Sequence, residues 1–233
     1  MMGRAAPLTR EYHIDMDAAE RRARLVARLV ERGTIRSASV EAAFRAVPRH
    51  CFLPQVPLDE VYRDEAIPTK TREHRWLSSS SQPAMMAIML EQLELAEGMR
   101  VLEIGAGSGY NAALLAYIVG PSGHVVTVDV DADTAASAKA HLASAGFDAV
   151  EVVCADGRQG FAPGASYDRI IATAAVPTLP SAWVDQLADG GIIVAPVGDI
   201  SAQRCIAFVQ ESGGLTQRSS VGCGFMLMRD AAS

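Results

Sequence analysis

The sequence has 233 residues, of which 49% are hydrophobic and 21% charged, and its 27 acidic and 21 basic side chains give a formal net charge of −6. This balance argues against a general nucleic-acid binder, which needs a basic face for phosphate contacts. The hydrophobic fraction excludes a wholly disordered chain. We expect one globular unit with an N-terminal helical region over residues 1–97 and an α/β region over residues 98–233.

No targeting or membrane-spanning segment is evident. The longest apolar run covers residues 112–119, far short of the roughly 20 residues that span a bilayer. We therefore expect a cytoplasmic protein without a membrane partner. The four cysteines form no C-x-x-C pair and have no histidine at zinc-finger spacing, so we expect reduced thiols and no bound metal.

The N-terminal half predicts three helices and a long irregular segment. Residues 1–16 have little periodicity and are expected to form a loose arm. Apolar residues at one-turn spacing predict helices over residues 17–31 and 40–47. Residues 49–80 lose this periodicity, and a loop of such length is usually functional. A methionine-rich helix, with its methionines in the core, is expected over residues 82–95.

After Gly98 the pattern changes to short alternating strands and helices. Strands are expected at residues 100–104, 124–128, 150–154, 170–173, 192–196, 205–210 and 221–228. Helices are expected at residues 110–119, 132–145 and 180–188, the last closed by Gly190 and Gly191. This alternation predicts a doubly wound, mostly parallel α/β sheet with helices on both faces, which binds ligands at the carboxyl ends of its strands.

A glycine loop follows the first of these strands, in the string V-L-E-I-G-A-G-S-G-Y. Gly105, Gly107 and Gly109 lack side chains, so a ligand can lie against backbone N–H groups at the start of the next helix. The string G-S-G-Y-N-A also fits a dinucleotide-binding pattern, with Asp129 about twenty residues further on. A nicotinamide-dependent oxidoreductase is therefore one compatible class.

Glu103 favours a different cofactor, because a carboxylate two residues before the first glycine would repel a pyrophosphate. It suits S-adenosylmethionine, which has no phosphate and carries an ammonium and a sulfonium centre. Asp129, followed by Val130, can then accept the two ribose hydroxyls. Asp156, followed by Gly157, is placed to meet the adenine amino group. These acidic residues could instead serve only as helix caps.

With these motifs, residues 21–198 resemble the protein-L-isoaspartate O-methyltransferases. The other matching strings are S-Q-P at 81–83, D-G-R at 156–158, Y-D-R-I-I-A-T-A-A at 167–175 and P-V-G at 196–198. The resemblance implies a Rossmann-like class I methyltransferase, with S-adenosylmethionine as donor, S-adenosylhomocysteine as product and an aspartyl or isoaspartyl peptide or protein as partner. It also implies that Ser81 lies beside the transferred methyl group and contacts the substrate carboxylate. The alternative role for Ser81 is a cap of the following helix.

The chemistry that the resemblance implies is an in-line displacement, in which a carboxylate oxygen attacks the sulfonium methyl. An aspartyl carboxyl has a reference pKa of roughly 3.9 and is ionised at neutral pH, so it needs no general base. Positioning and exclusion of water can supply most of the rate. The methyl ester then allows a backbone nitrogen to close a succinimide.

The loop before Ser81 departs from the family pattern. Where members commonly end this run with G-Q-T-I-S, this chain reads T-K-T-R-E-H-R-W-L-S-S-S-S, and its ending G-C-G-F-M-L-M-R also differs. We expect the charged part of the loop to form a basic, partly aromatic wall for an acidic peptide, unless its side chains are only solvated. The expected substrate-binding residues are Ser80, Ser81, Gln82, Lys70, Arg72, Arg75 and Trp76.

Both departures are similar to a branch of the family that esterifies an ordinary aspartate in ribosomally made, modified peptides, where the ester collapses to an aspartimide. We expect this chain to belong to that branch. General repair of L-isoaspartyl residues in damaged proteins is the alternative. A nicotinamide-dependent oxidoreductase and a non-catalytic peptide-binding module are more distant alternatives.

Overall fold

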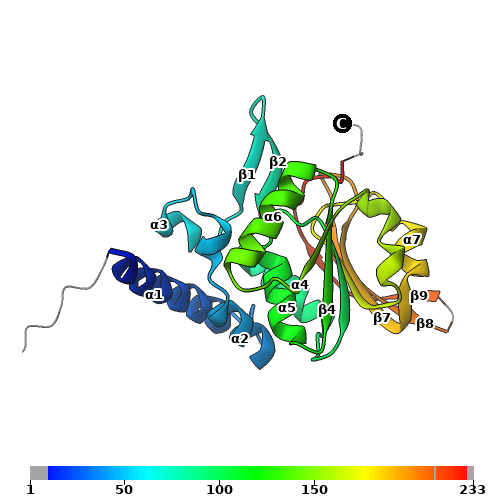
Figure 1. The fold of residues 1–233 in the computed structure, drawn as a ribbon. Coiled ribbons are helices and arrows are strands. Elements are labelled where there is room, and N and C mark those ends of the chain that lie inside the picture. Colours follow the sequence, from blue (N-terminus) through cyan, green and yellow to red (C-terminus); the bar gives the residue numbers. More distant parts are fainter. Residues whose placement is uncertain (1–9, 213, 230–233) are drawn as a thin grey trace, which may run out of the picture.

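The computed structural model describes residues 10–212 and 214–229, and its centre is a seven-stranded sheet (Figure 1). The strand order is β5-β4-β3-β6-β7-β8-β9. The strands are β3 (Arg100–Ile104), β4 (His124–Asp129), β5 (Glu151–Cys154), β6 (Tyr167–Ala172), β7 (Leu187–Val197), β8 (Arg204–Glu211) and β9 (Gly214–Gly222). The strands from β5 to β7 are parallel, and β8 and β9 continue the sheet antiparallel. The predicted α/β sheet is thus confirmed.

Helices cover both faces of this sheet. They are α1 (Arg10–Glu31), α2 (Ala38–Ala46), α4 (Pro83–Leu93), α5 (Tyr110–Val119), α6 (Ala132–Ser144) and α7 (Ser181–Asp185). Val101 and Val125 pack in a core cluster with α1, α2, α4 and α5. Leu102 and Val126, one position further along each strand, pack in a second cluster with Trp183 of α7. Successive strand residues point to opposite faces, so burial of both faces explains the continuous apolar strands.

The N-terminal region shares the first of these clusters with the α/β region, because Leu25, Phe44 and Met89 belong to it together with Leu114 of α5. The prediction of a loose arm over residues 1–16 is wrong for its second part, since α1 begins at Arg10. No glycine or proline interrupts the chain between residues 10 and 31, so the helix extends beyond its regular apolar spacing. Residues 1–9 lie outside the described residues.

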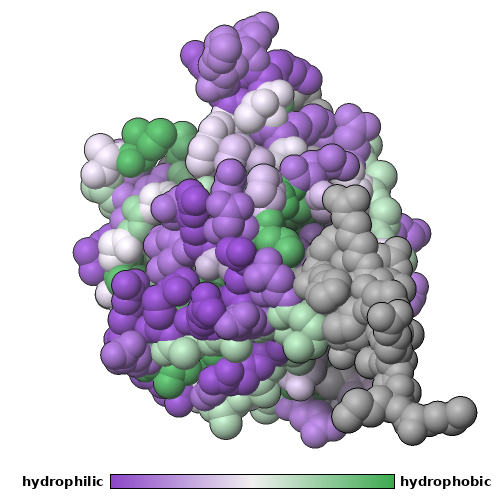
Figure 2. Space-filling view, turned by 90° about the vertical axis from the view of Figure 1, so that its left-hand side faces the viewer, coloured by the Kyte–Doolittle hydropathy of each residue, from purple (hydrophilic) through white to green (hydrophobic). Residues whose placement is uncertain are grey.

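The segment expected to be an irregular loop is instead structured. It contains η1 (Arg49–Phe52), α3 (Leu58–Val61) and an antiparallel hairpin of β1 (Ile67–Arg72) and β2 (Arg75–Ser80). Glu73 and His74 form the turn, with φ angles of 49° and 66°. This two-residue turn lacks the glycine or asparagine that signals such a conformation in a sequence. The hairpin projects from the molecule as a hydrophilic knob (Figure 2).

Two boundaries in the C-terminal half also differ from the prediction. Helix α7 ends at Asp185, and β7 begins at Leu187, which pairs with Tyr167, so Gly190 and Gly191 lie within a strand. The last strand ends at Gly222 rather than continuing through residues 223–228. Those residues leave the sheet edge and cross the carboxyl ends of the strands, where the backbone N–H of Ala175 donates to the carbonyl of Met226.

Among the cysteines, Cys205 is buried whereas Cys154 is exposed. Over residues 10–212 and 214–229, no helix combines the length and the apolar character that a membrane span requires.

Candidate active site

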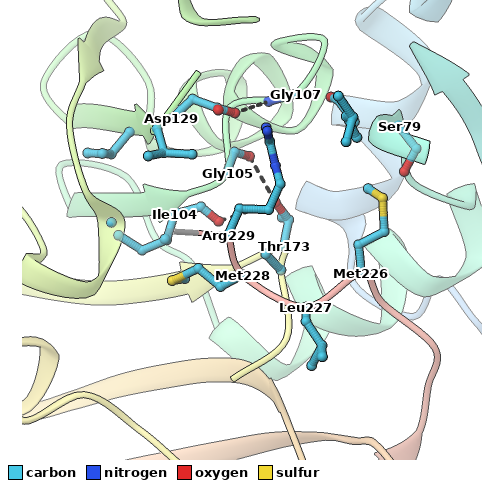
Figure 3. Close-up of a pocket in the computed structure, with 16 residues that line it drawn as sticks. Ser79, Ile104, Gly105, Gly107, Asp129, Thr173, Met226, Leu227, Met228 and Arg229 are labelled. Atoms are coloured by element: carbon cyan, nitrogen blue, oxygen red, sulfur yellow. Dashed lines mark hydrogen bonds between the residues drawn. The ribbon is translucent and has the colours of Figure 1, made fainter. Parts of the chain in front are cut away.

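A pocket lies at the carboxyl ends of β3, β4 and β6, beneath residues 226–229 and beside the end of the hairpin (Figure 3). Its lining gathers five predicted cofactor residues, Gly105, Gly107, Asp129, Val130 and Gly157. The other lining residues are Leu77, Ser78, Ser79, Ile104, Val128, Thr173, Ala174, Met226, Leu227, Met228 and Arg229. The sheet thus brings distant parts of the sequence to one place, as parallel α/β sheets do.

The glycine loop is shaped by two close contacts. A Cβ on Gly105 would lie 2.5 Å from Oγ1 of Thr173, whose hydroxyl donates to the carbonyl of Gly105 at 2.8 Å. A Cβ on Gly107 would lie 3.2 Å from the carbonyl oxygen of Ser79. Both glycines have positive φ angles, 102° and 52°. Larger residues would therefore fill the pocket or distort the loop.

Gly109 does not line this pocket. It has a φ of 88°, and a Cβ there would lie 3.1 Å from the carbonyl oxygen of Ala138 in α6. Its missing side chain lets α5 and α6 pack closely. The structure therefore gives Gly109 a packing role, and its contact with cofactor stays a prediction.

Glu103 lies fully buried at the side of the glycine loop. Its two carboxylate oxygens accept hydrogen bonds from Nδ2 of Asn111 at 2.8 Å and from Oγ1 of Thr127 at 2.6 Å. Burial raises the pKa of Glu103 to about 7, although both hydrogen bonds oppose the shift. Glu103, Ser81 and Asn111 line a small hollow. The Oδ1 atom of Asn111 is buried and has no hydrogen-bond partner. This surplus of acceptors suits a cation.

The two aspartates predicted for the cofactor differ in their surroundings. Asp129 borders the pocket, and its carboxylate accepts from the backbone N–H groups of Gly107 at 3.2 Å and Asp131 at 3.0 Å. Burial raises the pKa of Asp129, although these two hydrogen bonds act to lower it. Asp156 instead caps η2 (Gly157–Gln159) and accepts from the N–H of Arg158 at 3.0 Å. Of this predicted pair, Gly157 lines the pocket and Asp156 does not.

The serine run lies between this pocket and a larger cleft. Ser80 is buried, while the half-buried Ser81 borders both the hollow beside Glu103 and the cleft. The N-cap of α4 is Gln82, without a side-chain capping bond, and Asp64 Oδ1 accepts from the N–H of Ala84 at 2.8 Å. Capping therefore does not explain Ser81.

The larger cleft has a volume of about 500 Å³. It is lined by Asp64, Glu65, Ala66, Trp76, Ser79, Ser81, Gln82, Met85, Thr173, Gly222, Cys223, Gly224, Phe225 and Met226. Ser79, Thr173 and Met226 also line the first pocket, so the two spaces meet. No lysine or arginine is among these described lining residues, whereas two carboxylates are.

The predicted basic wall is divided in the structure. Nζ of Lys70 lies 2.7 Å from Asp131 and 3.1 Å from Asp133, so this ammonium is paired within the chain. The ion pair raises the pKa of Lys70 and lowers that of Asp131 to about 2. Arg72 and Arg75 face each other at the exposed hairpin tip, outside the lining of the cleft. Of the hairpin residues expected to bind substrate, Trp76 lines the cleft and is 48% exposed.

The hairpin and the C-terminal residues are linked through Asp131. The guanidinium of Arg229 lies 3.9 Å from the same carboxylate that binds Lys70. Its side chain crosses the pocket in Figure 3. In the part of the chain that the structure describes, no three His, Cys, Asp or Glu side chains are grouped so that they could hold a metal ion.

This fold and this pocket define a class I methyltransferase, dependent on S-adenosylmethionine. The family model for protein-L-isoaspartate(D-aspartate) O-methyltransferase matches residues 20–232, and the chain belongs to this family of carboxyl O-methyltransferases. The dinucleotide-dependent oxidoreductase is therefore excluded.

Relatives with this name match most of the chain. It is 41% identical over 207 residues to the protein-L-isoaspartate O-methyltransferase of Methanopyrus kandleri, covering 88% of this chain and 89% of that protein. It is 42% identical over 212 residues to protein-L-isoaspartate O-methyltransferase 1 of Rhodopseudomonas palustris, covering 89% and 83%.

Solved structures show the same fold. A protein-L-isoaspartate O-methyltransferase has a TM-score of 0.81 and 33% identity, over 90% of this chain and 66% of that chain. A second structure, from Plasmodium falciparum and in complex with S-adenosyl-L-homocysteine, has a TM-score of 0.77 and 19% identity, over 88% of this chain and 96% of that chain.

Proposed function

We propose that the chain methyl-esterifies an aspartyl-type side-chain carboxylate of a peptide or protein at the junction of the two pockets. The observation that carries this proposal is their shared wall of Ser79, Thr173 and Met226, with Ser81 beside it. A substrate in the cleft can therefore reach the cofactor pocket directly. Ser81 presents a hydroxyl to the cleft without a capping role to occupy it.

The residues of the first pocket fit S-adenosylmethionine. Gly105 and Gly107 have no side chain, and a Cβ at either position would come close to neighbouring atoms and take up space in the pocket. Asp129 supplies acceptors for ribose hydroxyls, and Val130 and Gly157 border the same space. Glu103 and the unpaired amide oxygen of Asn111 suit the ammonium group. When bound, S-adenosylmethionine supplies an electrophilic methyl group.

The protein's task is to position the carboxylate and exclude water, since that carboxylate is already ionised at neutral pH. The hydroxyl of Ser81 can donate a hydrogen bond to one carboxylate oxygen and leave the other free to react. The hairpin and residues 226–229 cover the pocket, which limits access of water.

For the substrate itself, we infer an aspartate in a ribosomally made, modified peptide, whose methyl ester collapses to an aspartimide. The hairpin supports this, because its sequence departs from the family motif and it carries exposed Arg72 and Arg75 together with Trp76, which lines the cleft. General repair of isoaspartyl residues is the second candidate. The 41% identity to a protein-L-isoaspartate O-methyltransferase over most of the chain favours it.

Mass spectrometry distinguishes these two substrates. The enzyme and S-adenosylmethionine are incubated with a generic isoaspartyl peptide, and separately with acidic precursor peptides before and after modification. A specialised enzyme gives a gain of one methyl group followed by loss of methanol only with a modified peptide. Turnover of the generic peptide at the rate of a repair enzyme would refute the specialised substrate. If none of these peptides is methylated on a carboxylate, the proposed transfer of a methyl group to a carboxylate is refuted.

A further inference from the structure

Arg49, the first residue of η1, is fully buried directly behind the serine run. The salt bridges among the described residues include none to its guanidinium. It donates instead to backbone carbonyls and one hydroxyl. Its acceptors are Val61 O at 2.9 Å, Arg63 O at 3.3 Å, Glu65 O at 3.3 Å, Ser80 O at 3.4 Å, Ser80 Oγ at 3.3 Å and Ser81 O at 3.0 Å.

This arrangement is costly for stability. Burial lowers the pKa of Arg49, but a guanidinium keeps its proton inside proteins. Burying a charge that has no salt bridge is unfavourable, and Nε of Arg49 has no hydrogen-bond partner, although the nearby Asp64 carboxylate favours the charged form. Carbonyl dipoles and the ring of Tyr110, whose centroid lies 5.9 Å away, offset part of this cost. An apolar side chain would leave five backbone carbonyls without this donor, so the guanidinium stabilises the segments around the serine run and also places a positive charge behind them.

The position of the charge suggests its role. Nη2 of Arg49 holds the carbonyl of Ser81, the residue that we place beside the substrate carboxylate. The cleft that leads to Ser81 contains Asp64 and Glu65 and no described lysine or arginine. The buried guanidinium therefore opposes the repulsion that Asp64 and Glu65 exert on a carboxylate entering this cleft.

We propose that Arg49 is a positioning residue that makes the site selective for a carboxylate. It fixes the backbone of Ser80 and Ser81 and supplies positive potential from within the protein. The proposal rests on the proposed function, because it assigns the acceptor of the methyl group to the space beside Ser81. In general, at an effective dielectric constant of about 20, a unit charge roughly 8 to 10 Å from a carboxylate changes its affinity about 15- to 30-fold, and Asp64 and Glu65 reduce this effect here.

The effect falls on binding and not on the chemical step. The carboxylate loses negative charge as it becomes an ester, so a nearby cation stabilises the bound carboxylate more than the transition state. Loss of the charge should therefore raise the Kd and KM of the peptide without lowering kcat in proportion.

The test compares a peptide that carries a carboxylate with the same peptide carrying an amide at that position. Their Kd values are measured with S-adenosylhomocysteine present, so no turnover occurs. Wild-type protein should bind the carboxylate peptide at least 10-fold more tightly. In R49M this ratio should fall to within about 3-fold of unity, while R49K, which keeps the charge, should retain most of it.

Arg169 provides the matched control. It is a half-buried arginine that also donates to backbone carbonyls, those of Leu93, Glu94 and Asp168, but it lies away from the cleft. R169M should lower the denaturation midpoint and leave the carboxylate-to-amide ratio unchanged.

Two results would overturn the role of Arg49. One is wild-type protein that binds both peptides equally, which needs no variant and so decides the matter even if R49M fails to fold. The other is a folded R49M with an unchanged ratio. If the enzyme still methylates a peptide carboxylate, either result overturns only the role of Arg49 and leaves the proposed function intact. If the enzyme methylates no peptide carboxylate, the proposed function itself is refuted.

Discussion

Replacing Glu103 with glutamine tests whether the cofactor pocket carries a charge at the expense of stability. Glutamine has nearly the same size, and its carbonyl can accept the bond from Asn111. Its amide can donate to Thr127, since a hydroxyl accepts as well as donates. The main change in the folded protein is therefore the loss of a buried negative charge.

The expected gain in the stability of E103Q follows from the pKa of Glu103, which burial raises from 4.5 to about 7. At 1.36 kcal/mol per pKa unit, the ionised carboxylate destabilises the folded state by about 3 kcal/mol. Because the folded pKa lies above the unfolded one, this penalty is complete above about pH 7. It declines as the pH falls toward 4.5, where the unfolded chain also binds the proton. E103Q should therefore be more stable than wild type by about 3 kcal/mol at pH 8.5 and by about 1 kcal/mol at pH 5.

Urea denaturation of both proteins without cofactor, at pH 5, 7 and 8.5, measures this difference. Glu97→Gln, at an exposed position before β3, is the control and should show no such pH dependence. Calorimetry with S-adenosylhomocysteine should show at least 10-fold weaker binding to E103Q. A stability difference that is equal at pH 5 and 8.5, or an E103Q protein less stable than wild type at pH 8.5, would refute the reasoning.

Three further substitutions probe the hairpin, the cleft and the serine run. Lys70→Met should raise the Kd of S-adenosylhomocysteine by no more than about 5-fold, because the ion pair from Lys70 to Asp131 is partly exposed and such pairs contribute little. Titrations at low and high salt should differ less than for wild type, and an unchanged Kd and salt dependence would contradict this link. Trp76→Ala should raise the peptide KM about 5- to 10-fold while the affinity for S-adenosylhomocysteine stays constant; equal loss of both affinities would indicate general damage. Ser81→Ala should lower kcat at least 10-fold without changing the denaturation midpoint, since Ser81 is not the N-cap of α4; unchanged transfer would leave its hydroxyl without a role.

Much of the α/β core could be predicted from the sequence. Strand β3 and helix α5 have the predicted bounds, because strands buried on both faces are continuously apolar and glycines mark the turn between them. The same logic placed Gly105, Gly107 and Asp129 at one edge of the sheet. Topology determines that edge, so these positions follow from strand order and need no knowledge of side-chain packing.

The hairpin and its contacts could not be predicted in this way. Strand β1 is largely exposed, so it lacks an apolar alternation, and its turn at Glu73 and His74 carries no glycine signal. Lys70 pairs with Asp131 across 61 positions of sequence, and such a contact depends on the folded arrangement. Arg49 looks like a surface residue in the sequence, because nothing in R-H-C-F indicates that its charge is buried.

The convergence of the hairpin and the C-terminal residues on Asp131 has a consequence for the order of events in a catalytic cycle. Met226 lines both pockets, so a peptide in the cleft lies beside one side of the route to the cofactor. We expect the donor to bind before the peptide and its spent form to leave after the ester. High peptide concentrations would then slow cofactor exchange, and opening of these two segments would limit the turnover rate in place of methyl transfer.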